Sequence, residues 1–166
     1  METQIISGFP GVGKTVFCRQ SALRVMDSDS RTFSWRLPGV RHPEFPQNYL
    51  SHIREHLGQV HYICISSHAE IREALAAQKI PYTLVYPARE LKDEYLARYR
   101  QRRSLTAFVD FMQDHWDGFI MEIERETFPS LIRLERSQFL ADVIPPAGGL
   151  KPWRNPTPCP RADRPQ

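Results

Sequence analysis

Residues 8–15 read G-F-P-G-V-G-K-T, which is the complete phosphate-binding-loop pattern G-x-x-x-x-G-K-[ST]. Glycines in such a loop let backbone N–H groups converge on phosphate oxygens with no Cβ in the way. Residues 4–7 favour a strand, and residues 15–23 contain no Gly or Pro and can form a helix. Strand, loop and helix in this order bring a helix dipole to the anion. We therefore interpret the stretch as a phosphate site rather than as a glycine-rich turn without a ligand.

The motif assigns a role to each of its polar side chains. Lys14 is expected to reach the β- and γ-phosphates of a nucleoside triphosphate, and the Thr15 hydroxyl is expected to hold Mg²⁺. ATP and Mg²⁺ are thus the expected co-substrate and cofactor. The predicted nucleotide-binding residues are Gly8, Gly11, Val12, Gly13, Lys14 and Thr15.

Composition sets bounds on the class of protein. A chain of 166 residues with 41% hydrophobic and 25% charged residues is typical of one globular domain. A net charge of +3 does not argue for nucleic acid or for an anionic membrane. Cys18, Cys64 and Cys159 have neither zinc-site nor paired-disulfide spacing. No apolar stretch has the length of a membrane span, so we expect a soluble, cytoplasmic protein without a membrane partner.

The rest of the chain alternates between strand and helix patterns. Such alternation predicts an α/β fold with a parallel sheet of about five strands and helices on both faces. Strands are expected at 4–7, 24–27, 61–66, 83–86 and 131–134, and helices at 14–23, 47–57, 69–78, 88–103 and 105–126. In the last helix, apolar residues recur at three- and four-residue steps, which we interpret as a core-facing stripe: Leu105, Phe108, Val109, Met112, Trp116, Phe119, Ile120 and Ile123.

The chain divides into a domain at 1–144 and a proline-rich tail at 145–166, which holds half of the prolines. Such a tail cannot keep a helix or a central strand, and we expect it to be largely disordered. Its arginines suit either simple solvation or contact with an anionic partner: Arg154, Arg161 and Arg164.

The loop and the five-strand pattern together resemble the nucleoside-monophosphate-kinase and shikimate-kinase group of P-loop phosphotransferases. The resemblance implies a three-layer P-loop NTPase fold with a helical lid. It also assigns roles to Asp27 and Asp29, which lie at the end of the second predicted strand. One carboxylate would orient or deprotonate the acceptor oxygen, and the other would support Mg²⁺. Period two on a strand would place both on one face. The alternative is a turn, since D-S-D-S is also good turn material.

In the same resemblance, residues 88–103 correspond to the lid, whose arginines close over the transferred phosphate. Arg98 and Arg102 are four residues apart and would share a helix face, and arginine suits bidentate phosphate contact. Both are predicted catalytic residues, with Lys14 and the two aspartates. The alternative is ordinary surface ion pairing, because Glu90, Glu94 and Arg98 are also spaced by four.

The acceptor is expected along the carboxyl edge of the sheet. The segment after the second strand supplies aromatic and basic side chains that suit a nucleotide, although a lone Trp is often a core residue. His68 either contacts the ligand or caps the following helix. The predicted acceptor-binding residues are Asp27, Asp29, Arg31, Trp35, Arg36, Ser66 and Ser67. Unlike many P-loop enzymes, the chain has no acid at the end of strand 61–66, so Thr15 and Asp27 are the predicted metal ligands.

These patterns predict an ATP-dependent kinase acting on a nucleoside monophosphate. A polynucleotide 5′-hydroxyl and a small hydroxylated metabolite stay open as acceptors, although nucleic acid is not favoured. A nucleotide-dependent switch or NTPase with a protein partner is the competing class, because a phosphate loop alone does not separate the two.

Overall fold

The computed structural model describes residues 2–144, and the proline-rich tail at 145–166 lies outside the described residues. The chain forms an α/β domain around a five-stranded parallel sheet with strand order β2-β5-β1-β6-β7. The elements are β1 (Gln4–Gly8), α1 (Lys14–Gln20), β2 (Val25–Asp27), α2 (Arg31–Ser34), β3 (Trp35–Leu37), β4 (Val40–Arg41), α3 (Gln47–His56), β5 (Tyr62–Ser66), α4 (Ala69–Ala77), β6 (Thr83–Pro87), the 3₁₀ turn η1 (Arg89–Leu91), α5 (Lys92–Gln101), α6 (Thr106–Glu124), β7 (Ser130–Leu134) and α7 (Leu140–Val143).

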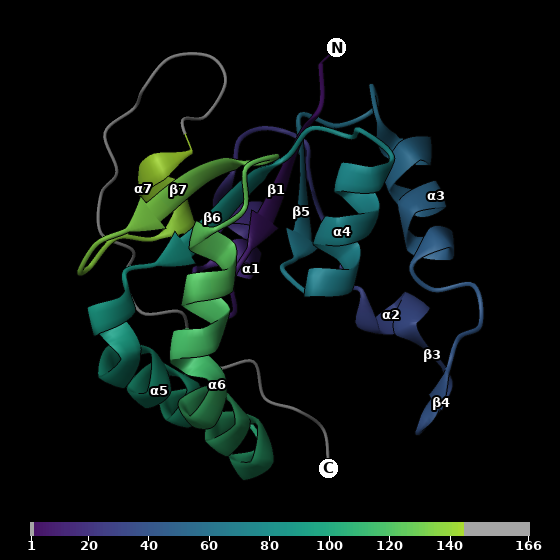
Figure 1. Ribbon diagram of the computed structural model, residues 1–166. Coiled ribbons are helices and arrows are strands. Elements are labelled where there is room, and N and C mark those ends of the chain that lie inside the picture. Colours follow the sequence, from purple (N-terminus) through teal and green to yellow (C-terminus); the bar gives the residue numbers. More distant parts are fainter. Residues whose placement is uncertain (1, 145–166) are drawn as a thin grey trace, which may run out of the picture.

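Helices cover the sheet on both faces. The connections leave β1 toward β2 in one direction and return toward β7 in the other, and right-handed crossovers place the two sets of helices on opposite faces. Figure 1 shows α4 and α6 in front of the sheet and α1 behind it. The first residue of α7 bonds back to the loop that precedes α1, because the Leu140 N–H donates to the Val12 carbonyl at 2.9 Å.

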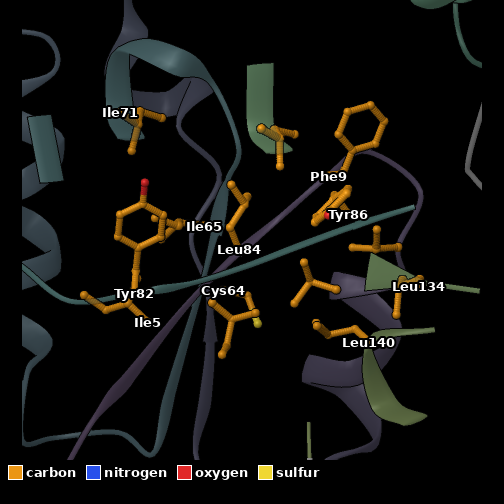
Figure 2. Packing of buried hydrophobic residues seen from close by; sticks show 14 of the residues in the cluster. Ile5, Phe9, Cys64, Ile65, Ile71, Tyr82, Leu84, Tyr86, Leu134 and Leu140 are labelled. Atoms are coloured by element: carbon orange, nitrogen blue, oxygen red, sulfur yellow. The ribbon is translucent and has the colours of Figure 1, made fainter. Parts of the chain in front are cut away.

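The core fills both faces of the sheet. Strand residues alternate between the faces, so Leu84 and Tyr86 of β6 lie with Phe9 and Ile71, whereas Cys64 of β5 lies on the side of Leu140 (Figure 2). The three central strands, β1, β5 and β6, are each buried at four of their five residues, as expected for a sheet that is covered on both sides.

The predicted strands and helices are confirmed within a few residues. The helix predicted at 14–23 is shorter and ends at Gln20, where Ser21 turns extended. No strand or helix is predicted within 31–46, but this stretch folds into the short helix α2 and a two-stranded sheet of β3 and β4. The turn between these strands is Pro38-Gly39, with Gly39 at a φ of 77°, the pairing typical of a type II turn.

Several segments extend beyond the carboxyl ends of β1, β2, β5 and β6. Figure 1 shows α5 and α6 on one side of this edge and the α2–β4 segment on the other. Between residues 2 and 144, no helix is both long and apolar enough to cross a bilayer.

The α6 helix is fixed to the domain by one fully buried tryptophan. The indole N–H of Trp116 donates to the Arg89 carbonyl at 2.8 Å, and its ring meets Phe9 and Tyr95 with ring centroids 5.4 Å apart in each pair. This contact joins α6 to the segment that follows β1 and to α5.

Trp116→Ala should lower the free energy of unfolding by about 3–5 kcal/mol, because it empties a packed site and leaves a carbonyl unpaired. Urea denaturation measures the loss. Met121→Ala on the exposed side of the same helix should cost less than about 1 kcal/mol. Equal losses in the two variants would contradict this account of the core.

Candidate functional site

A cleft of about 1600 Å³ opens at the carboxyl edge of the sheet. Five parts of the chain line it: the phosphate loop, the segment from Asp27 to Phe45, the segment from Ser66 to Arg72 that enters α4, the walls of α5 and α6, and the segment from Ser137 to Asp142. A volume of this order is larger than one nucleotide needs, so the cleft has room for two ligands.

In the phosphate loop, every carbonyl from Gly8 to Gly13 accepts a hydrogen bond. Three of the donors come from segments far away in the sequence, in α5 and α7. In loop order, the pairs are Lys14 Nζ to Gly8, Val12 N to Phe9, Tyr99 Oη to Pro10 at 2.7 Å, Arg98 Nη1 to Gly11 at 2.7 Å, Leu140 N to Val12 at 2.9 Å and Phe17 N to Gly13 at 2.9 Å. These bonds fix the backbone conformation of the loop.

Glycine is required at both ends of the loop. A Cβ on Gly8 would lie 2.8 Å from Cδ of Lys14, so any larger residue displaces the lysine. Gly13 has a φ of 95°, the left-handed region that L residues avoid, and a Cβ there would meet Phe139 at 3.3 Å. The first helical residue, Lys14, follows directly, so the N–H groups of the first turn of α1 have no partner within the helix.

The Lys14 ammonium sits against the loop carbonyls beneath the cleft. Burial lowers its pKa from 10.5 to about 8, against the opposing effect of neighbouring acidic groups that include Asp27. Dehydration of the charge is the dominant cause. A phosphate bound in the cleft would supply the counter-charge that the amine lacks.

Asp27 and Thr15 face one another. The Thr15 hydroxyl donates to Oδ2 of Asp27 at 3.1 Å, which brings a residue of α1 and the last residue of β2 together at the floor of the cleft. Hydroxyl and carboxylate oxygens are the donor set that Mg²⁺ takes alongside waters and phosphate oxygens. Among residues 2–144, no group of three or more His, Cys, Asp or Glu side chains is arranged to hold a metal.

Asp29 has a different partner from Asp27. The prediction that the two share a strand face is wrong, because β2 ends at Asp27 and Asp29 lies in the following turn. Its carboxylate accepts from the backbone N–H of Arg31 at 2.9 Å and from Nε at 2.8 Å. Burial would raise the pKa of Asp29, but these hydrogen bonds and the guanidinium charge outweigh it and hold the pKa below its ordinary value. Both carboxylates line the cleft.

The two predicted arginines of residues 88–103 differ in position. Arg98 is a member of α5, donates to the Gly11 carbonyl, and lies over the rings of Tyr95 and Phe139 at 4.3 and 4.5 Å. It also forms the i,i+4 pair with Glu94 at 3.0 Å, so the surface-pairing alternative is also present.

Arg102 follows the end of α5, lies over Tyr99, and donates to the Ser104 hydroxyl at 3.0 Å. It is exposed and lines the cleft. Of the two, Arg102 is the one whose charge remains accessible to a ligand.

The predicted acceptor residues are only partly brought together. Arg31 and Trp35 line the cleft, whereas Arg36 is exposed on β3 and is not part of its lining. The core alternative for Trp35 is wrong, because 46% of the residue is exposed. In place of Arg36, the cleft receives Arg41 of β4, whose guanidinium lies 5.5 Å from the Trp35 ring and pairs with Glu70.

The serines at the end of β5 line the cleft floor. The Ser30 hydroxyl donates to the Ser66 hydroxyl at 3.0 Å, and the Ser67 carbonyl accepts from Arg72. His68 occupies the N-cap position of α4 without a side-chain cap bond. Burial, and then the charges of Lys14 and Arg41, lower its pKa.

Two contributions were missed by sequence reasoning. Phe139 packs over Gly13 and Arg98, and only the chain reversal before α7 brings it there. The α6 stripe was interpreted wholly as core, but Leu105 is 80% exposed, and Phe108 and Phe119 line the cleft. The sequence does contain a signal for this second apolar surface of α6, because further apolar residues, including Phe111, lie beside the predicted core stripe.

Comparison of the chain with protein-family models finds no matching family, and comparison with curated proteins finds no relative.

The depressed pKa of Lys14 predicts a pH dependence of stability. Between about pH 8 and 10.5 the unfolded chain holds a proton on Lys14 that the folded protein has released, so stability rises with pH in this window. Relative to Lys14→Met, the wild-type free energy of unfolding should increase from pH 8 to 9.5, by at most about 1.4 kcal/mol per pH unit. Denaturant titrations at each pH measure it, and parallel profiles would contradict the prediction.

Arg98→Ala should lower the free energy of unfolding by about 1–3 kcal/mol, because it leaves the Gly11 carbonyl without its donor. Arg100→Ala, on the exposed side of the same helix, is the matched control and should change stability by less than about 0.5 kcal/mol. Thermal or urea unfolding compares the two. A loss of the same size in both variants would show that Arg98 does not hold the loop.

Proposed function

We propose that this protein is a P-loop phosphotransferase of three-layer fold that moves the γ-phosphate of Mg-ATP to a nucleotide-like acceptor. The observation that carries the proposal is the position of Asp27. Its carboxylate contacts Thr15 of the phosphate loop and lines a cleft whose volume exceeds what one nucleotide needs. An acid at the junction of a donor site and an acceptor space is the arrangement that phosphoryl transfer requires.

The loop supports the donor half of this proposal. All of its carbonyls have donors, three of them from α5 and α7, and the N–H groups of Gly11 and Gly13 and of the first turn of α1 would bind anionic oxygens. Lys14 lies beneath the same space and gains a counter-charge when the phosphates bind. Arg102 would neutralise charge that develops on the transferred group.

The residues at the floor of the cleft suit Mg²⁺. Thr15 and Asp27 would hold Mg²⁺ together with phosphate oxygens and water, since this ion usually takes only one or two protein ligands. When bound, Mg²⁺ neutralises phosphate charge and orients the γ-phosphate. We assign Asp29, which is paired with Arg31, to the acceptor side, where the pair would orient the incoming group.

The acceptor half rests on the second side of the cleft. Trp35 is exposed there beside Arg41, so a flat ring and an anionic group can be held together. This combination favours a nucleoside monophosphate over a small acid. A switch or NTPase would need a residue that orients water, and the described residues offer no acid at the end of β5 for that purpose.

ADP release from Mg-ATP tests the proposal across ribo- and deoxynucleoside monophosphates and 5′-hydroxyl oligonucleotides. Wild-type release should be stimulated by one acceptor class, and Lys14→Met should abolish it. Asp27→Asn should lower kcat by about 10²-fold or more, because it removes a charge aimed at the reacting groups. Asp114→Asn, an exposed position on α6, is the matched control and should keep full turnover.

ADP release that requires Lys14 but is not stimulated by any acceptor would instead support an NTPase or a nucleotide-dependent switch. Stimulation by oligonucleotides alone would move the acceptor from a free nucleotide to a polynucleotide end.

A further inference from the structure

The inner end of the cleft, between α4 and α6, has a chemistry that the phosphate end lacks. Arg72 of α4 is only 4% exposed and still lines the cleft. Its Nε donates to the Ser67 carbonyl at 2.9 Å, and its Nη2 donates to Oε1 of Glu122 at 2.6 Å. A second carboxylate, from Glu126, pairs with the same guanidinium. The proposed transfer of phosphate uses none of these groups.

Arg72, Glu122 and Glu126 together carry a net charge of −1. Glu126 is tied further by the Tyr82 hydroxyl, which donates to it at 3.0 Å. Glu122 differs, because its side chain is 51% exposed and it lines the cleft. One of its oxygens accepts from Arg72, which fixes the carboxylate and leaves capacity for another donor. The cleft is therefore cationic at Lys14 and Arg102 and hydrogen-bond accepting at Glu122.

A row of aromatic side chains runs along α6 toward this carboxylate. Phe111, His115 and Phe119 follow one another at four-residue steps on α6, with ring centroids 4.4 and 5.8 Å apart. Phe111 and Phe119 line the cleft, and Phe111 is 49% exposed. Glu122 follows Phe119 by three residues, about 4.5 Å along the helix axis and on the same face. A planar ring against Phe119 thus presents its edge to Glu122.

We propose that the acceptor carries a heteroaromatic base with an exocyclic amino group, and that Glu122 selects this group. The inference rests on the proposed function and names the substrate class within it. The amino N–H donates to the free oxygen of Glu122. The ring lies against Phe119 rather than against Trp35, which leaves Arg41 for the anionic group of the acceptor. A base with a carbonyl at the same position would bring two acceptors together, which costs binding energy. Arg72 is a positioning residue that acts through Glu122.

Calorimetric binding without ATP tests this with two matched pairs of ligands, cytidine against uridine monophosphate and adenosine against inosine monophosphate. In each pair the amino group is replaced by a carbonyl. The wild type should bind the amino member about tenfold more tightly or better. Glu122→Gln keeps the shape and can donate to a carbonyl, so the preference should fall to threefold or less in both pairs. Glu124→Gln, an exposed neighbour on α6, should keep the wild-type preference.

A second variant provides a test that does not depend on correct folding of Glu122→Gln. Phe119→Leu keeps the apolar contact but removes the ring, and it should weaken all four ligands by a similar factor while leaving the preference intact. Equal affinities within each pair for the wild type, or an unchanged preference in Glu122→Gln, would overturn the inference. So would failure of all four ligands to bind at millimolar concentration.

Binding and turnover separate the two proposals. An amino preference in binding without acceptor-stimulated ADP release would overturn the phosphotransferase proposal and keep the base site. Acceptor-stimulated ADP release that is equal for the amino and carbonyl members of each pair would keep the phosphotransferase proposal and overturn the base site.

Discussion

A loop that turns its backbone N–H groups toward an anion must turn its carbonyls the other way, and those carbonyls need donors. This constraint organises the domain. Tyr99, Arg98 and the backbone of Leu140 donate to three successive loop carbonyls from segments that lie about 90 to 130 residues away in the chain. The sheet fixes where the loop begins, and α5 and α7 fix its outer side. Much of the C-terminal half of the domain thus serves the geometry of eight N-terminal residues.

The cleft has two ends of opposite character, and this polarity follows from which strands supply them. The loop after β1 and the end of α5 bring cationic groups. The crossover from β5 brings the guanidinium of Arg72, which the carboxylates of Glu122 in α6 and Glu126 just after α6 more than neutralise. Arg72 illustrates why a buried arginine is not automatically an anion site. Its position alone suggests phosphate binding, but its partners reverse the sign of its surroundings.

The sequence predicted the sheet, its helices and the strand–loop–helix arrangement around residues 8–15 well, because each depends on local pattern: a glycine motif, apolar strands and a period of 3.6. It did not predict the partners of the loop carbonyls. Arg98 was predicted to contact the transferred phosphate, not the Gly11 carbonyl, and no local pattern distinguishes Tyr99. Asp27 and Asp29 both line the cleft, but their different partners were not predicted, because they depend on a strand that ends at Asp27. The cleft-facing side of α6 was missed because an apolar stripe cannot reveal which of its edges meets a cavity.

The attachment of α5 to the loop also sets where the domain can deform. A swing of α5 away from the cleft would break the bonds from Arg98 and Tyr99 and expose the rings of Tyr95 and Tyr99, which are almost fully buried. The opposite wall is built from short elements, α2 and the β3–β4 hairpin, whose outer residues are exposed. We therefore expect the two sides of the cleft to differ in mobility. The α5 side stays attached to the phosphate loop, and a conformational change around a ligand takes place on the side of the β3–β4 hairpin.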